Sequence, residues 1–257
     1  MDLFEQRFAE AMRGSVLPMD TVMRYVGEVP GKRLRPRLVL LSARLFGPVN
    51  ESTRRTALFV ELLHTATLIH DDVVDVSDSR RGQPSVNARW NNATAVLSGD
   101  YLLSKAMLLL SDPSDSPILQ EMLRTAMSMS EGELLQNGFP QGEAGGGTVE
   151  AYLDIIERKT ARLIRACCVG GALSVQASEE ALQKIADFGL HLGLVFQMRD
   201  DLLDQDNPSI TALAERLLPD YLDRTLQSLN ALAPVAKDPA VLDSLRELTL
   251  FCAQRNQ

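Results

Sequence analysis

The sequence predicts an all-α fold, a single-domain helical bundle of about ten helices. Almost no stretch alternates polar and apolar residues with a period of two, as half-buried strands do. Long stretches rich in Leu, Ala, Met, Glu and Arg instead carry their apolar residues at helical spacing. Glycine and proline pairs divide these stretches into segments of helical length, so the boundaries support the same class.

The breakers place the helices in order along the chain. The expected helices span residues 3–12, 18–27, 33–46, 52–76, 92–111, 115–135, 148–169, 178–206, 211–231 and 239–255. Ser178, followed by two glutamates, and Thr148, followed by Glu150, are typical helix starts because a hydroxyl caps the first turn and acids favour it. No internal repeat and no long linker is visible, so residues 1–257 are expected to form one domain.

Composition excludes several classes of protein. The chain has 257 residues, 45% of them hydrophobic, which is enough for a large core. Its 26 basic against 34 acidic residues give a net charge of −8, so a nucleic-acid partner is not expected. The odd number of cysteines, Cys167, Cys168 and Cys252, lacks metal-ligand spacing and indicates reduced packing residues in a cytoplasmic protein. No apolar run reaches membrane-spanning length, and the amphipathic N-terminus does not resemble a signal peptide.

Two of the expected helices combine apolar surroundings with acidic residues. Residues 56–70 are apolar nearly all round, which predicts a buried central helix. The same helix carries His64, Thr67, Asp71 and Asp75 at spacings of 3, 4 and 4, which place them on one face. The helix at 178–206 repeats the pattern with Gln197, Asp200 and Asp204.

Each helix carries an Asp-Asp-x-x-Asp cluster, at 71–75 and at 200–204. Three carboxylates within one turn repel one another and are costly to bury, so a cation must neutralise them. No Lys or Arg follows four residues after the first aspartate of either cluster, whereas Mg²⁺ shared with a phosphate would serve. A single cluster is equally typical of a solvated helix end; two copies on apolar helices favour metal binding.

Basic residues supply the other half of an anion site. They lie in Gly31-Lys32-Arg33-Leu34-Arg35-Pro36, in Arg80-Arg81-Gly82 and at Lys159, which falls on the apolar stripe of its helix. Arg and Lys are good diphosphate ligands. Each also has a plainer interpretation: the run at 32–35 as solvated charge or a targeting segment, Arg80 and Arg81 as partners of Asp75 and Asp78, Lys159 as a residue whose head reaches water, and His64 as a core histidine.

The ordered set of motifs resembles the trans-polyprenyl diphosphate synthases over about residues 25–206. It comprises residues 31–36, Glu61 to Asp75, Arg80-Arg81-Gly82, Ser98 to Leu103, Glu131-Gly132-Glu133, Lys159-Thr160-Ala161 and Phe196 to Asp204. The resemblance implies an all-helical isoprenoid synthase bundle, usually a homodimer, that uses three Mg²⁺ ions. It also implies a prenyltransferase that condenses isopentenyl diphosphate with an allylic prenyl diphosphate.

The resemblance assigns a role to each matching residue. Asp71, Asp75 and Asp200 would be metal ligands and, with Lys159, catalytic residues. Asp72, Asp201 and Asp204 would support the metals or their waters. Arg80, Lys159, Thr160 and Gln197 would bind the allylic diphosphate. Lys32, Arg35, His64 and Arg81 would bind the diphosphate of isopentenyl diphosphate, with Arg33 nearby. The two aspartate clusters are expected to hold one diphosphate jointly.

Product length is partly readable from residues one or two turns before the first cluster, where Leu63 lies a turn deeper than Thr67 and Ala66. Bulky side chains there shorten products in the resembled family. Thr67 and Ala66 are small, and a helix turn adds about 5.4 Å of depth, so we expect a medium or long product.

The resemblance breaks after Asp204. A Gly- and Lys-containing loop and several tens of residues expected there are absent near 207–210. Either the chain truly lacks this segment, or the sequence is joined across a mobile loop, which we favour. Two other functions stay open: a silent regulatory subunit of a synthase, which typically loses one aspartate cluster, and a cyclase, which usually lacks the cations at Lys32, Arg35 and Arg81.

Overall fold

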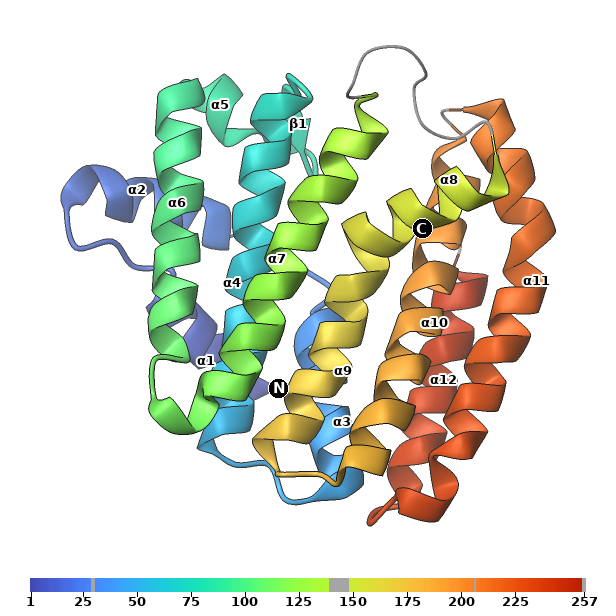
Figure 1. The fold of residues 1–257 in the computed structure, drawn as a ribbon. Coiled ribbons are helices and arrows are strands. Elements are labelled where there is room, and N and C mark those ends of the chain that lie inside the picture. The colour runs from blue at the N-terminus through green and yellow to red at the C-terminus, as the bar shows by residue number, and fades with distance from the viewer. Residues whose placement is uncertain (29–30, 139–147, 206, 256–257) are drawn as a thin grey trace. The chain divides into compact units, whose positions relative to one another are not determined.

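The computed structural model describes residues 1–28, 31–138, 148–205 and 207–255 (Figure 1). It divides into two compact units. The first comprises Met1–Arg37 and Arg54–Ser116, and the second comprises Leu38–Thr53 and Pro117–Gln257. Each unit is described by itself.

The first unit is helical apart from one short hairpin. Its elements are α1 (Asp2–Ala11), α2 (Leu17–Gly27), the start of α3 (Leu34–Phe46), most of α4 (Glu51–Val74), β1 (Ser79–Arg80), β2 (Gln83–Pro84), α5 (Val86–Arg89), α6 (Asn92–Leu109) and η1 (Pro113–Asp115). The hairpin pairs Ser79 with Pro84 and Arg80 with Gln83. It and α5 carry no periodicity that could have predicted them.

The hairpin and α5 close the carboxyl end of α4. Val76 turns the chain with a positive φ of 52°, and the Ser77 amide donates to the carbonyl of Asp72 at 2.9 Å. Asn87 donates its side-chain amide to the carbonyls of both Asp72 and Ser77, at 3.2 and 3.1 Å. These bonds satisfy carbonyls that a helix end leaves without partners, so α4 stops at a defined residue beside its aspartates.

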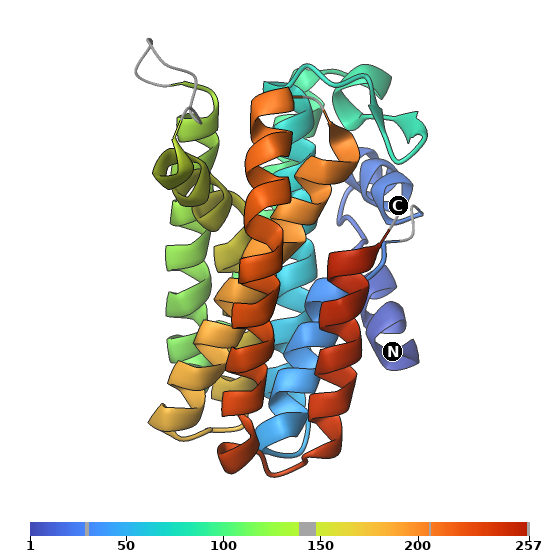
Figure 2. The ribbon, with the colours of Figure 1, turned by 90° about the vertical axis from the view of Figure 1, so that its right-hand side faces the viewer.

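The second unit is built around one long helix. Its elements are the rest of α3, α7 (Ser116–Gln136), α8 (Val149–Ile156), the π-helical turn η2 (Glu157–Ala161), α9 (Arg162–Ser174), α10 (Glu179–Asp204), α11 (Pro208–Ala231), η3 (Ala233–Val235) and α12 (Ala240–Gln254). Helix α10 packs against α9, α11 and α12, which surround it in Figures 1 and 2. Three residues, 205–207, connect α10 to α11.

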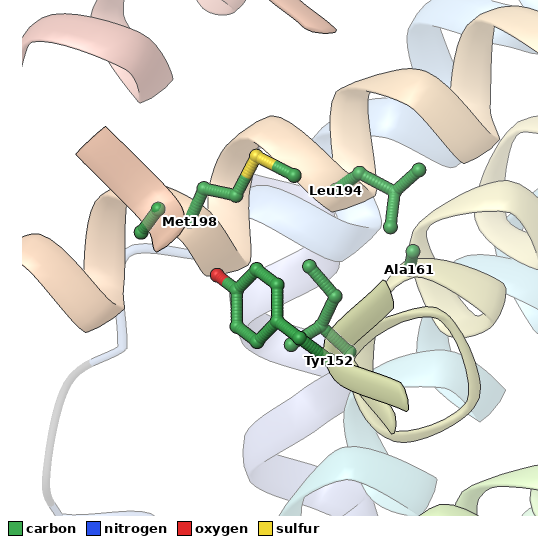
Figure 3. Packing of buried hydrophobic residues seen from close by; sticks show 6 residues of the cluster. Tyr152, Ala161, Leu194 and Met198 are labelled. Atoms are coloured by element: carbon green, nitrogen blue, oxygen red, sulfur yellow. The ribbon is translucent and has the colours of Figure 1, made fainter. Parts of the chain in front are cut away.

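One buried cluster anchors the end of α10 that carries the aspartates. Figure 3 shows Tyr152 of α8, Ala161 of the π turn, and Leu194 and Met198 of α10 packed together. Ala161 and Met198 are fully buried. The tyrosine hydroxyl lies at the edge of the cluster, next to α10, where a polar group can still find a partner.

The structure confirms the all-α class and corrects one predicted element. The Ser178 and Thr148 side chains do cap α10 and α8, accepting from Ala181 and Ala151 amides at 3.3 and 3.2 Å. The single helix expected over 148–169 is wrong, because the π turn interrupts it and α9 runs on to Ser174. All three cysteines are buried. Among the described residues, no single helix has both the length and the hydropathy needed to cross a membrane; only α6 taken together with residues 113–136, across a break, passes that test.

Candidate active-site residues

The carboxyl end of α4 presents two of the three aspartates of the first cluster. The Asp75 amide donates to the Asp71 carbonyl at 2.8 Å, so the helical spacing that stacks these two residues continues just past the helix. Asp71 is half-buried and Asp75 exposed. Asp72 is instead buried, and its carboxylate accepts from Arg80 Nε at 2.9 Å and Nη2 at 2.5 Å. Arg80 therefore pairs with Asp72, not with Asp75 or Asp78.

Three guanidinium groups influence His64, which lies about two helical turns before Asp71 on α4. Burial, followed by the positive charges of Arg35, Arg81 and Arg80, holds the pKa of His64 well below its ordinary 6.5. The imidazole is therefore neutral at physiological pH and can serve as a hydrogen-bonding group. The first unit brings together Arg35, His64 and Arg81 of the four residues expected for isopentenyl diphosphate, and the fourth, Lys32, is exposed.

In the second unit, one hydrogen-bonded chain links the π turn to the second aspartate cluster. Thr160 donates its hydroxyl to Gln197 Oε1 at 2.6 Å, and Gln197 Nε2 donates to Asp201 Oδ1 at 2.9 Å. The Tyr152 hydroxyl donates to the other oxygen, Asp201 Oδ2, at 2.6 Å. Burial raises the pKa of Asp201, while these two hydrogen bonds oppose that rise. The chain fixes the orientation of Gln197 and of Asp201 together.

The π turn also sets the direction of Lys159. Its ammonium group lies 2.6 Å from Glu133 Oε2, with 29% of the lysine side chain exposed. The prediction that Lys159 lies on an apolar stripe is corrected here, because the extra residue of the turn changes the register. Two glycines give the turn room: a Cβ on Gly132 would lie 2.7 Å from the Lys159 amide nitrogen, and one on Gly193 would lie 2.8 Å from the Cβ of Ala161.

Asp200, the expected third metal ligand, forms an ion pair with Arg255 beyond α12. Burial raises the pKa of Asp200, Arg255 lowers it, and the nearby carboxylates of Asp204 and Asp201 raise it again. Asp204 is exposed. The cluster is thus a set of three mutually repelling carboxylates, two of which already hold specific partners.

The carboxylates of Asp71, Asp75 and Asp200 fit a hard divalent cation shared with a ligand. Among the described residues, no three His, Cys, Asp or Glu side chains form a metal-binding group. Mg²⁺ commonly takes only one or two carboxylates and completes its octahedron with water and phosphate oxygens. Asp71 with Asp75, and Asp200, offer such incomplete oxygen sets.

Sequence reasoning missed four partners that the structure supplies. Tyr152 and Arg255 received no role, and Glu61 and Glu133 were noted only as parts of motifs. Each pairs with a residue 26 to 55 positions away in the chain, and local spacing cannot predict such a pair. That both aspartate clusters hold one diphosphate stays a prediction.

Comparisons with known proteins agree with the motifs. A family model described as "Polyprenyl synthetase" matches residues 18–212, which include both aspartate clusters. The chain is 38% identical over 208 residues to an all-trans-nonaprenyl-diphosphate synthase of Rhodobacter capsulatus, covering 80% of this chain and 63% of that protein. It is 35% identical over 195 residues to the octaprenyl diphosphate synthase of Escherichia coli, covering 76% of this chain and 60% of that protein.

A solved structure extends the likeness to three dimensions. The polyprenyl synthase of Caulobacter crescentus matches with a TM-score of 0.87 and 27% identity, over 100% of this chain and 95% of that one. The chain spans about three fifths of the length of the curated relatives it matches. Because the family model covers most of the chain and its motifs coincide with the residues above, this chain belongs to the polyprenyl synthetase family.

Proposed function

We propose that this chain is a magnesium-dependent trans-prenyltransferase that condenses isopentenyl diphosphate with an allylic prenyl diphosphate. The observation that carries the proposal lies within the first unit. The aspartate pair, Asp71 and Asp75, follows on the same helix as His64, whose neighbours include Arg35 and Arg81. Carboxylates for metal ions and guanidinium groups for diphosphate therefore occur at one end of α4.

The reaction begins when the allylic C–O bond breaks and leaves a diphosphate anion and a carbocation. Mg²⁺ held by Asp71 and Asp75 in the first unit, and Mg²⁺ held by Asp200 in the second, would stabilise the charge that develops on a diphosphate leaving group. The family resemblance and the matched solved structure, described as complexed with calcium and isoprenyl diphosphate, support a divalent cation here. We propose three such ions.

In the second unit, Lys159, Thr160 and Gln197 would bind the allylic diphosphate. The Thr160–Gln197–Asp201–Tyr152 chain holds the amide and hydroxyl in fixed orientations before substrate arrives. Polar groups that are already oriented stabilise the charge of the transition state without the free-energy cost of reorganising, and this effect is often the largest in enzyme catalysis. Lys159 must exchange its Glu133 partner for a phosphate oxygen, which is favourable because the diphosphate carries more charge.

In the first unit, Lys32, Arg35, His64 and Arg81 would hold isopentenyl diphosphate so that its double bond attacks the carbocation. The proton that is then lost would go to the released diphosphate. Arg80, which is anchored on Asp72, would be a further ligand of the allylic diphosphate. Ala66 and Leu63, both buried on α4, belong to the apolar wall that keeps water from the cation. Small residues at Ala66 and Thr67 support a medium or long product.

The exposed face of α6 supports a homodimer as part of this proposal. Val96, Leu97, Met107 and Leu108 leave 42%, 63%, 37% and 71% of their surface exposed, at spacings that place them along one side of the helix. Apolar surface on this scale is typical of protein interfaces. Light scattering should give twice the chain mass for the native protein, and the double substitution of Leu97→Glu with Leu108→Glu should give the monomer mass. A native monomer would refute this part.

One assay tests the activity and its alternatives. Purified protein receives Mg²⁺, farnesyl diphosphate and labelled isopentenyl diphosphate, and products are resolved by length. Longer prenyl diphosphates support the synthase, cyclic hydrocarbon would indicate a cyclase, and no turnover would indicate a regulatory subunit. Asp71→Asn should abolish elongation, whereas Asp78→Asn, a matched exposed aspartate close to the cluster, should retain it.

A further inference from the structure

The segment that carries Lys32 and Arg35 has a third cationic residue, Arg33, whose side chain is buried. Arg33 has a positive φ of 52° immediately before α3, and its carbonyl accepts the first helical bond, from the Arg37 amide at 3.1 Å. This conformation is rare for a residue with a side chain and persists only where surrounding contacts hold it. Arg33 is also buried, with 9% of its side chain exposed, while Lys32 beside it is exposed.

The buried guanidinium of Arg33 donates from all three of its nitrogens to two glutamates. Its Nη1 donates to Glu61 Oε1 at 2.7 Å, and its Nε and Nη2 donate to the two oxygens of Glu5 at 3.1 and 3.2 Å. Phe8 covers one face, with the guanidinium carbon 4.1 Å from the ring centre. Two carboxylates already neutralise this buried guanidinium and would repel a diphosphate that approached it. Arg33 is therefore not a substrate ligand here.

Glu61 has a second cation beside it. A Cβ placed on Gly31 would lie 3.2 Å from Arg81 Nη1 and 3.4 Å from both Arg33 Nη1 and Glu61 Oε1, so these three atoms surround one point. Only 6% of the Glu61 side chain is exposed, and a carboxylate this deep needs a cationic partner. Two arginines thus compete for one buried carboxylate.

We propose that Arg33 is a positioning residue that takes up the Glu61 carboxylate and so leaves Arg81 to bind the diphosphate of isopentenyl diphosphate. The inference rests on the proposed function and assigns Arg33 and Glu61 a part in substrate selection. Without the Arg33 charge, Glu61 draws Arg81 into a buried ion pair. The diphosphate then has to displace a carboxylate to reach Arg81.

Four variants separate this role from a merely structural one. Arg33→Met removes the charge and keeps the stem. Glu61→Gln removes the competing charge but keeps an oxygen that accepts from Arg33. The double variant combines both changes. Arg37→Met is the control, because Arg37 is an exposed arginine in the first turn of α3, four residues after Arg33.

Calorimetric binding of isopentenyl diphosphate is measured first, followed by KM for each substrate. Arg33→Met should weaken isopentenyl diphosphate binding about tenfold, the loss expected for one charge-assisted hydrogen bond, and should leave KM for farnesyl diphosphate within about twofold. Glu61→Gln should bind isopentenyl diphosphate as well as or better than the native protein. The double variant should recover most of the affinity that Arg33→Met loses, and the control should match the native protein.

The inference is overturned if Arg33→Met raises both KM values alike, or if the double variant binds no better than the single one. If Arg33→Met does not fold, Glu61→Gln alone decides: weaker binding refutes the inference and equal or tighter binding supports it. A native protein that neither binds isopentenyl diphosphate nor elongates farnesyl diphosphate refutes the proposed function instead.

Discussion

Arg255 forms an ion pair with Asp200 across 55 residues of chain, and the same guanidinium donates to the Phe196 carbonyl at 3.2 Å. Its carbon lies 4.1 Å above the Phe196 ring, and the Arg255 carbonyl accepts from Arg199 Nε at 2.8 Å. The expected ligand of the third metal ion is thus neutralised by an arginine of the chain itself. Replacing Arg255 should therefore show how much the stability of the protein depends on a cation beside the carboxylates at 200–204.

Arg255→Gln should destabilise the metal-free protein by about 2 kcal/mol, less than a fully buried pair because Asp200 remains one third exposed. The loss should be largest without divalent cation, because Asp201 and Asp204 then repel an uncompensated Asp200. Adding Mg²⁺ should raise the thermal midpoint more in Arg255→Gln than in the native protein. Arg246→Gln is the control, because Arg246 of α12 donates to the neutral side chain of Asn230 and not to an aspartate. Equal magnesium increments in all three proteins would contradict this prediction.

His64 should make the fold less stable in acid. Its pKa in the folded protein lies well below 6.5, so below pH 6.5 the unfolded chain binds a proton that the folded protein does not. The contribution of His64 to the free energy of unfolding is therefore fully present above pH 6.5. It falls as the pH decreases from 6.5 toward the pKa of His64 in the folded protein. His64→Gln removes this dependence. The free energy of unfolding of the variant minus that of the native protein should therefore be more favourable at pH 5.5 than at pH 8. Urea denaturation at both pH values measures it; an identical difference at the two would show that His64 does not titrate this way.

Ala66→Phe should shorten the product. Ala66 is 2% exposed and lies five residues before Asp71, where a phenyl ring would occupy the space that the proposal gives to the growing chain. Some overpacking cost, about 1–3 kcal/mol, is expected as well. Chromatography of the products gives their length, and a thermal midpoint identifies a variant that has lost its fold. A stable Ala66→Phe protein with native product length would refute the assignment of this space to the growing chain, and Ala66→Ser should leave the length unchanged.

Gly193→Ala should disturb the π turn. The added methyl would lie 2.8 Å from the Ala161 Cβ and 2.9 Å from its carbonyl oxygen, next to Thr160. Because much of that contact is with backbone, we expect a loss of about 2–3 kcal/mol and a raised KM for the allylic substrate. Gly27→Ala is the control, since its new methyl would meet only the flexible Met12 side chain. If Gly193→Ala keeps the native KM for the allylic substrate, the π turn does not contribute to binding of that substrate.

The sequence alone determined most of the helices and the two acidic clusters. Helical periodicity, glycine and proline breaks, and the Ser178 and Thr148 caps are local signals, and α4 and α10 begin and end within two residues of their predicted positions. The Asp71 and Asp75 stacking follows from helix geometry, so it too was readable. The helix that was predicted wrongly contains a π turn. Close packing against Gly132 and Gly193 makes room for this turn, and the local sequence periodicity does not predict it.

Only the tertiary structure decided which charge pairs with which. Arg80 pairs with Asp72 and not with the aspartates expected from the sequence, and Arg33 pairs with Glu61 although it follows the exposed Lys32. Spacing along a helix fixes which residues share a face, because the rise and twist per residue are constant. The partner of a charge instead depends on which oppositely charged atoms packing brings within a few ångströms, and on how much water packing removes from around them.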